Sequence, residues 1–413
     1  MIRNDAFPFL VVCIWLLPFA SFQFLPFGIP LYPIEIVLLI ASPFLLNGGI
    51  REVFGVPVAR KIALFSVILL GGALLSYMTH PYTLTGLGQI KSFFLMPMIF
   101  WVLMTPLVGD LDHRQRVFQH LRLMFTWAAV VALLDGFSGG FTYDHRLSAW
   151  FDSPNLLAIF FLPGVILWWV HLLSEKIVRV SDAFSWLAVT TVFLLTQSYG
   201  AFGAAVVAGV SFLWISRGHV SRKPLLWRMA TFTLILAGLG LFFGGGAAVE
   251  KWDMLVSGNE RSSLSSRLMI WRSAVRMIQD SPWTGIGPGR FQSVYLEYQQ
   301  FYPPYLEWAV PHPHNLFLAV WLASGVIGVL AGVWLCIFLF RFLKRIPTKE
   351  ERALMAALFL GLFVSGLFDV PYFRAEFCFM FWLALALFTG MFSCKSLPQS
   401  ITVTIKQETL LAD

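Results

Sequence analysis

Long apolar segments constrain this chain more than any other feature of its sequence. About twelve stretches approach the roughly 20 residues that an α-helix needs to cross a bilayer. Of the 413 residues, 58% are hydrophobic and only 12% are charged, which excludes an ordinary soluble domain. We predict an all-α, polytopic transmembrane helical bundle. Its spans lie near residues 9–25, 31–47, 61–79, 92–108, 121–137, 154–173, 183–198, 200–216, 229–246, 315–340, 353–369 and 374–393.

The positions of Lys and Arg indicate the orientation. Most of the 29 basic residues fall in alternate connections between the spans, and short basic connections stay in the cytoplasm. Both termini are therefore expected inside the cell. Topology also explains the net charge of +7, so no nucleic-acid partner is expected. A cleavable signal peptide is not expected, because no small-residue cleavage site follows the first apolar run.

Four regions follow from this topology. Residues 1–246 form an N-terminal transmembrane bundle of about nine spans. Residues 247–314 form one large, partly helical external loop, residues 315–393 the C-terminal membrane helices, and residues 394–413 a cytoplasmic tail. A loop as long as 247–314 is usually functional rather than a mere connector.

An amphipathic helix is predicted inside the external loop, because apolar residues recur at spacings of three and four. Arg267 and Arg272 flank this apolar stripe, and Arg276 lies beyond Arg272. We expect the helix to lie on the membrane surface. Its guanidinium groups would bind the phosphates of a lipid-linked substrate there, or would only anchor the helix. The stripe consists of Leu264, Leu268, Trp271, Val275 and Ile278.

A glycine-rich turn follows this helix after Pro282. Its residues, 285–290, end in Arg290. The backbone N–H groups of such a turn can form a nest for an anion. A plain turn is the favoured interpretation, because the spacing is not a dinucleotide-binding fingerprint.

His314 and Asn315 stand at the start of the span 315–340. The helix macrodipole disfavours an imidazolium at this end, so we expect a neutral His314 that can accept a proton as a general base. The alternative is that His314 or Asn315 only caps the helix. His312 lies between two prolines, and we expect it to point away from the helix start.

A family resemblance becomes visible at these residues. His314-Asn315, then nine residues, then Gly325 and Gly328 resembles the pattern of O-antigen ligases, within the wider O-antigen ligase and polymerase superfamily. Two further stretches are similar to that family. They are RLSAWFDSPN at 146–155, and SRLMIW at 266–271 followed by PWTGIG at 282–287.

The resemblance implies a metal-independent, inverting glycosyltransferase without a cofactor. It would act on a glycan linked to undecaprenyl diphosphate, at the periplasmic face of the bacterial inner membrane. His314 would then be the base, and Arg267 would bind the donor diphosphate. The chain departs from the family at Tyr199, where ligases have an arginine, so Arg146, Arg272 or Arg290 would supply that charge. Supporting roles fall to Asn315, Trp271, Asn155, Gly325 and Gly328.

Other interpretations remain open. The acceptor is the lipid A core, a growing polysaccharide or a glycoprotein, so a polymerase or a protein O-glycan ligase is an alternative to a true ligase. A non-enzyme alternative is a transporter of small ions or solutes, although ionisable residues are scarce near the span midpoints. Asp369, Arg374 and Glu376 in the last external turn would line the acceptor side or, as we favour, form a surface ion pair.

Overall fold

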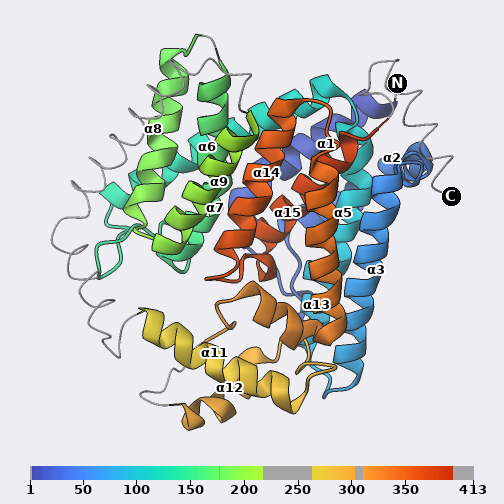
Figure 1. Cartoon of the computed structure of the whole chain (residues 1–413), viewed down its shortest axis with the longest axis vertical. Helices are drawn as coiled ribbons and strands as arrows, with labels where there is room; N and C mark the ends of the chain where they lie inside the picture. Colours follow the sequence, from blue (N-terminus) through green and yellow to red (C-terminus); the bar gives the residue numbers. More distant parts are fainter. Residues whose placement is uncertain (1, 176, 217–262, 303–309, 394–413) are drawn as a thin grey trace.

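The structure is a computed structural model that describes residues 2–175, 177–216, 263–302 and 310–393. Within these ranges the chain forms helices and no named strand, which confirms the predicted all-α bundle. Figure 1 shows an upright bundle with two helices, α11 and α12, lying at one end of it. In chain order the helices are α1 (Ile2–Leu16), α2 (Pro33–Phe54), α3 (Pro57–Met78), α4 (Leu84–Gln89), α5 (Met96–Met104), α6 (Leu111–Phe137), α7 (Pro154–Ser174), α8 (Val180–Leu195), α9 (Tyr199–Ser216), α11 (Ser263–Asp280), α12 (Phe291–Tyr298), α13 (Leu316–Leu343), α14 (Lys349–Ser365) and α15 (Ala375–Gly390).

Every predicted span that falls in the described residues contains a helix, and the span 229–246 lies outside them. By length and composition, six of the described helical segments can cross a membrane: Pro57–Met78, Leu84–Val108, Leu111–Phe137, Pro154–Ser174, Tyr199–Ser216 and Leu316–Leu343. The chain is therefore a multi-pass membrane protein.

The first predicted span has the wrong boundaries. Instead of running over 9–25, the chain leaves α1 at Leu16 and makes one 3-10 turn, Leu17–Phe19. Pro18 is the second residue of that turn, because proline suits the first positions of a helix and cannot continue α1. The residues from Ala20 to Tyr32 then form irregular structure with a second short turn, Pro26–Gly28.

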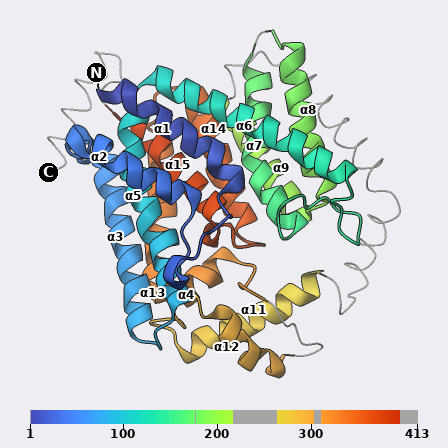
Figure 2. The same ribbon diagram turned by 180° about the vertical axis from the view of Figure 1, so that it is seen from behind.

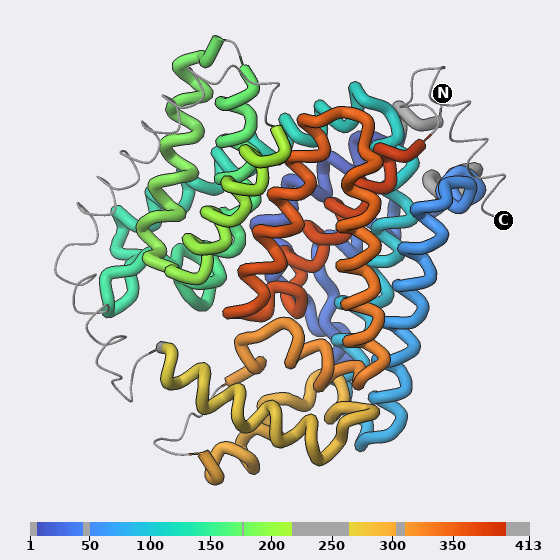
Figure 3. The backbone as a smooth tube through the Cα atoms, viewed as in Figure 1, coloured from blue at the N-terminus to red at the C-terminus, as the bar shows by residue number. Residues whose placement is uncertain are grey.

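Helices far apart in the sequence lie side by side in the bundle. α15 is its most enclosed helix, with nearly every residue buried, and it packs against α5. α3 packs against α13, and α9 against α14, as the mixture of colours in Figure 3 shows. From behind, α1 and α6 cover the bundle (Figure 2). Gly72 of α3 permits close approach, because a Cβ there would lie 2.8 Å from the Ser324 carbonyl oxygen.

α13 is broken at Gly325, which divides it into a first part, 316–324, and a longer second part. Gly325 has a φ of 64°, a left-handed conformation that favours glycine. A Cβ at this position would lie 2.0 Å from the carbonyl oxygen of Trp283, which instead accepts the backbone N–H of Val326 at 3.2 Å. The break therefore docks the turn after α11 directly onto α13.

α11 packs against the first part of α13 and against α12. The residues buried on this side of the helix are Met269, Ile270, Ala274, Met277 and Ile278. Of the predicted apolar stripe, Leu264, Leu268 and Val275 are 42–43% exposed on the protein. The position of this stripe on a membrane surface stays a prediction.

Candidate functional site

Asn315 caps α13 and thereby fixes the position of His314. The Asn315 side-chain oxygen accepts the backbone N–H groups of Phe317 at 3.0 Å and Leu318 at 3.1 Å. His314 precedes the cap with a φ of 47° and is not itself the capping residue. The imidazole therefore stands at the mouth of the helix, where 29% of its side chain is exposed.

Asp369 lies against His314 although 55 positions separate them in the sequence. The two atoms that face each other, His314 Nδ1 and Asp369 Oδ1, are 3.3 Å apart, while the same carboxylate accepts the Val370 N–H at 2.8 Å. Burial alone would raise the pKa of Asp369, but the neighbouring His314 and His312 outweigh it and hold that pKa below its ordinary value. Asp369 is therefore a buried carboxylate of the site and not part of the expected surface ion pair.

His312 also belongs to this cluster, so the expectation that it points away is wrong. Its ring lies 4.6 Å from that of His314, centroid to centroid, and the rings are nearly perpendicular. Burial lowers the pKa of His312 to about 4, which leaves it neutral at physiological pH. Within the described part of the chain, neither histidine Nδ1 has a well-aligned hydrogen-bond partner.

The turn that follows α14, residues 366–369, holds several parts of the site together. The Gly366 carbonyl accepts the Leu316 N–H at 2.7 Å, and the Leu367 carbonyl accepts Nδ2 of Asn315 at 3.0 Å. The next carbonyl, that of Phe368, accepts Nε of Arg267 at 3.1 Å. One short turn therefore fixes the start of α13, the arginine from α11 and, through Asp369, the imidazole.

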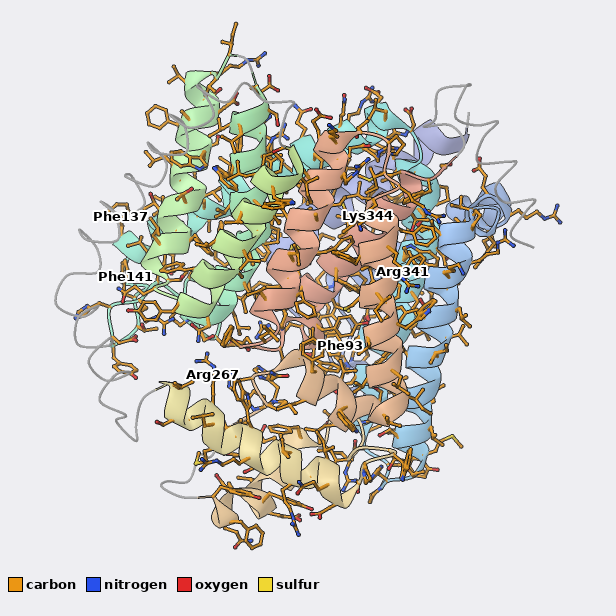
Figure 4. All side chains as sticks on the ribbon, viewed as in Figure 1. Phe93, Phe137, Phe141, Arg267, Arg341 and Lys344 are labelled. Atoms are coloured by element: carbon orange, nitrogen blue, oxygen red, sulfur yellow. The ribbon has the colours of Figure 1, made fainter. Side chains whose placement is uncertain are left out.

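Arg267 and Arg146 meet across the site. Figure 4 shows Arg267 at the start of α11, between this helix and the ends of the bundle helices. Arg146 donates to the Thr196 carbonyl and to Oδ1 of Asn155, both at 2.7 Å. Burial lowers the pKa of each arginine, and each guanidinium stays charged. Arg267 also lowers the pKa of Arg146 by repulsion, so the two cations lie within electrostatic range of each other.

The two arginine candidates that remain lie elsewhere. Arg272 is exposed on α11 and lines a groove of about 300 Å³ together with Arg276 and the aromatic residues Trp271 and Tyr302. Arg290 donates to the Ile286 carbonyl of its own turn at 3.2 Å. Neither arginine has a recorded contact with His314 or Arg267, whereas Trp271 reaches the site by donating to the His314 carbonyl at 3.4 Å.

The glycine-rich turn is structural, as favoured from the sequence. The N–H groups of Ile286 and Gly287 both donate to the Leu322 carbonyl, at 2.8 and 3.1 Å, and that of Gly289 donates to Oε1 of Gln89 at 2.8 Å. An anion nest would need these groups for its ligand. They attach the turn to α13 and α4 instead.

Arg374 and Glu376 form the ion pair expected in the last turn, at 2.7 Å, but Glu376 is fully buried. Arg374 also donates to Asp152 at 2.5 Å and to the Ser21 hydroxyl at 2.9 Å. This network joins three segments of the chain that lie far apart in the sequence. Asp369 is not one of the carboxylates paired with Arg374, and it faces His314 instead.

Sequence reasoning did not identify Asp369 as the partner of His314. The available signal was a lone carboxylate at the end of an apolar span, where burial without a partner is costly. Together, the described residues bring an imidazole, a buried carboxylate and the Arg267 guanidinium to the turn 366–369, with Arg146 within electrostatic range of Arg267. Such a set can deprotonate a hydroxyl group and stabilise a departing diphosphate.

Comparison with known proteins finds relatives that are named for the transfer or ligation of glycans. The chain is 26% identical over 217 residues to the general O-oligosaccharyltransferase of Acinetobacter baylyi, covering 47% of this chain and 36% of the relative. It is 25% identical over 185 residues to a putative polysaccharide ligase of Rickettsia conorii, covering 42% of each chain. A Haemophilus influenzae protein described only as uncharacterized is 24% identical over 219 residues, covering 47% of this chain and 54% of the relative.

The chain thus spans between about a third and about half of the length of the curated relatives it matches. Residues 183–333 match the family model described as O-antigen ligase. This match includes Arg267, Trp271, His314, Asn315 and Gly325, all placed in or beside the site above. This multi-pass membrane protein is therefore O-antigen ligase-like over residues 183–333.

Proposed function

We propose that this protein transfers a glycan from an undecaprenyl-diphosphate-linked donor to a hydroxyl group of an acceptor. The observation that carries the proposal is the turn 366–369, which joins a proton acceptor, His314, to a fixed cation, Arg267. The family match supports glycan transfer as the reaction class. The bacterial inner membrane is the expected location, with the site on the periplasmic side and both termini in the cytoplasm.

His314 acts as the general base. Asp369 faces Nδ1 and favours the tautomer with a proton on that nitrogen, which leaves the Nε2 lone pair for the acceptor hydroxyl. The separation of 3.3 Å is longer than a strong hydrogen bond, and such contacts commonly shorten when substrate binds. As the acceptor oxygen loses its proton to Nε2, it attacks the anomeric carbon of the donor sugar.

Arg267 and Arg146 stabilise the leaving group. The bond between the anomeric carbon and the diphosphate oxygen breaks, and its electron pair leaves with undecaprenyl diphosphate. Guanidinium groups fixed before the reaction stabilise this charge without having to reorganise. Each arginine also has an acidic neighbour, Asp144 beside Arg146 and Asp369 near Arg267. Two guanidinium groups within electrostatic range of each other suit a doubly charged ligand, which supports a diphosphate. Displacement from the opposite face inverts the anomeric centre, and no step requires a metal ion.

Three acceptors fit this donor chemistry: the lipid A core, the end of a growing polysaccharide, or a protein side chain. Because one relative is named a general O-oligosaccharyltransferase, we retain a protein side chain as an alternative to the acceptor of a ligase. Deleting the gene and separating the envelope glycans by gel electrophoresis distinguishes the first two. Loss of a ligase leaves unattached polymer on the carrier lipid, whereas loss of a polymerase leaves single repeat units.

The direct test is glycan transfer in reconstituted membranes with purified lipid-linked donor. We expect His314→Ala and Arg267→Ala to abolish transfer while the protein still inserts and elutes as a single species. Arg290→Ala is a matched control, because Arg290 has no recorded contact with either residue. Retained activity in both site variants would refute the proposal.

A further inference from the structure

His312 has no role in the proposed transfer, although it lies against the residues that do. Its Nδ1 is buried and, within the described residues, has no hydrogen-bond partner. A buried polar atom in this state is destabilising unless a ligand satisfies it. A nitrogen lone pair can be satisfied by a proton donor or by a metal ion.

The neighbours of His312 decide between these two ligands. One ligand atom from each of His312, His314 and Asp369 lies within 4.8 Å of the other two. Ligands about 2.1 Å from a tetrahedral ion stand roughly 3.4 Å apart. The pair formed by His314 Nδ1 and Asp369 Oδ1 already has that spacing, at 3.3 Å. His312 supplies the third ligand atom, no more than 4.8 Å from the other two.

We infer that His312, His314 and Asp369 form a site for a transition-metal ion such as Zn²⁺, and that its occupation inhibits glycan transfer. Two imidazoles with one carboxylate select zinc or a related ion rather than Mg²⁺ or Ca²⁺, which prefer sets of oxygen ligands. Three protein ligands leave the fourth position for water.

Inhibition follows from the two nitrogens of one imidazole. Without a metal, the proton of a neutral His314 stays on Nδ1, beside Asp369, and Nε2 accepts the acceptor proton. A metal ion on Nδ1 uses the lone pair of that nitrogen, so the single N–H proton of the neutral ring moves from Nδ1 to Nε2. The ring then has no lone pair for the acceptor hydroxyl. This mechanism rests on the proposed function, whereas metal binding itself does not.

Direct binding of Zn²⁺ tests the site. The full chain, freed of any affinity tag and stripped with chelator, is dialysed against ZnCl₂ in nanodiscs, and bound zinc is counted by mass spectrometry. We expect one equivalent for the wild type, and affinity at least about tenfold weaker for His312→Asn. His145→Ala, which removes an exposed histidine of another external segment, should bind as the wild type does.

Cobalt gives a second readout that needs no variant. Co²⁺ bound to the wild type should show the intense visible absorption of a tetrahedral site, and Zn²⁺ should remove it. In the transfer assay, Zn²⁺ should inhibit reversibly, and His312→Asn should need at least about tenfold more zinc for the same inhibition. Absence of the cobalt spectrum, or equal zinc binding by the wild type and His312→Asn, would overturn the site. If zinc binds but no glycan transfer is found, the proposed function fails and the metal site stands.

Discussion

Replacing Asp369 by asparagine removes one charge from the site and preserves the shape of the side chain. In the transition state His314 becomes positively charged, 3.3 Å from the Asp369 carboxylate when measured between Nδ1 and Oδ1. At an effective dielectric constant of about 20, two unit charges at this distance attract by about 5 kcal/mol. The amide dipole of asparagine and the partial exposure of His314 retain some of this stabilisation. We therefore expect a loss of about 3 kcal/mol, or roughly a hundredfold in kcat.

The assay is transfer at saturating acceptor in nanodiscs, with kcat and the donor KM measured separately. Asp369 acts through His314 and has no place in the donor site, so kcat should fall while the donor KM changes little. Asp369→Glu should recover part of the rate because it restores the charge. Asp112→Asn is the control, since Asp112 is an exposed aspartate paired with Arg116 at 2.8 Å. A folded Asp369→Asn protein that keeps kcat within about threefold, or that changes only the donor KM, would refute the orienting role.

Three further predictions concern other parts of the structure. Gly325→Ala should prevent stable folding or strongly lower the melting temperature, because its Cβ would meet the Trp283 carbonyl at 2.0 Å and its φ is 64°; a melting curve like that of the wild type would contradict the break in α13. Arg267→Lys should lower kcat/KM for the donor at least tenfold, about 1.4 kcal/mol. Lysine keeps the charge but loses the planar guanidinium and the Nε–H that donates to the Phe368 carbonyl. Unchanged kinetics would show that charge alone suffices. His312 gives the protein a pH dependence of stability, because folding lowers its pKa from 6.5 to about 4. As the pH falls, the unfolded chain therefore takes up the proton first. The stability present above pH 6.5 decreases by about 3 kcal/mol as the pH drops to 4. Melting temperatures measured over this range should show a smaller fall for His312→Asn than for the wild type, and equal falls would contradict the assignment.

The helices could be predicted from the sequence because the length of an apolar segment is a local property. The site could be predicted only in part. His314 and Arg267 stand in recognisable patterns, but the contact between Asp369 and His314 depends on how α14 packs beside α13. The side of α11 that packs on the protein could not be predicted for a related reason. Periodicity identifies which residues share a side, whereas the neighbouring helices, here α13 and α12, decide which side is buried in the protein.

The turn after α14 holds its partners mainly through main-chain oxygens, those of Gly366, Leu367 and Phe368. Every amino acid carries such an oxygen, so these hydrogen bonds do not depend on which side chains stand at 367 and 368. Saturation mutagenesis should therefore find these two positions tolerant of many substitutions. Position 369, directly after them, should tolerate almost none, and proteins of this kind could diverge widely around a single fixed aspartate.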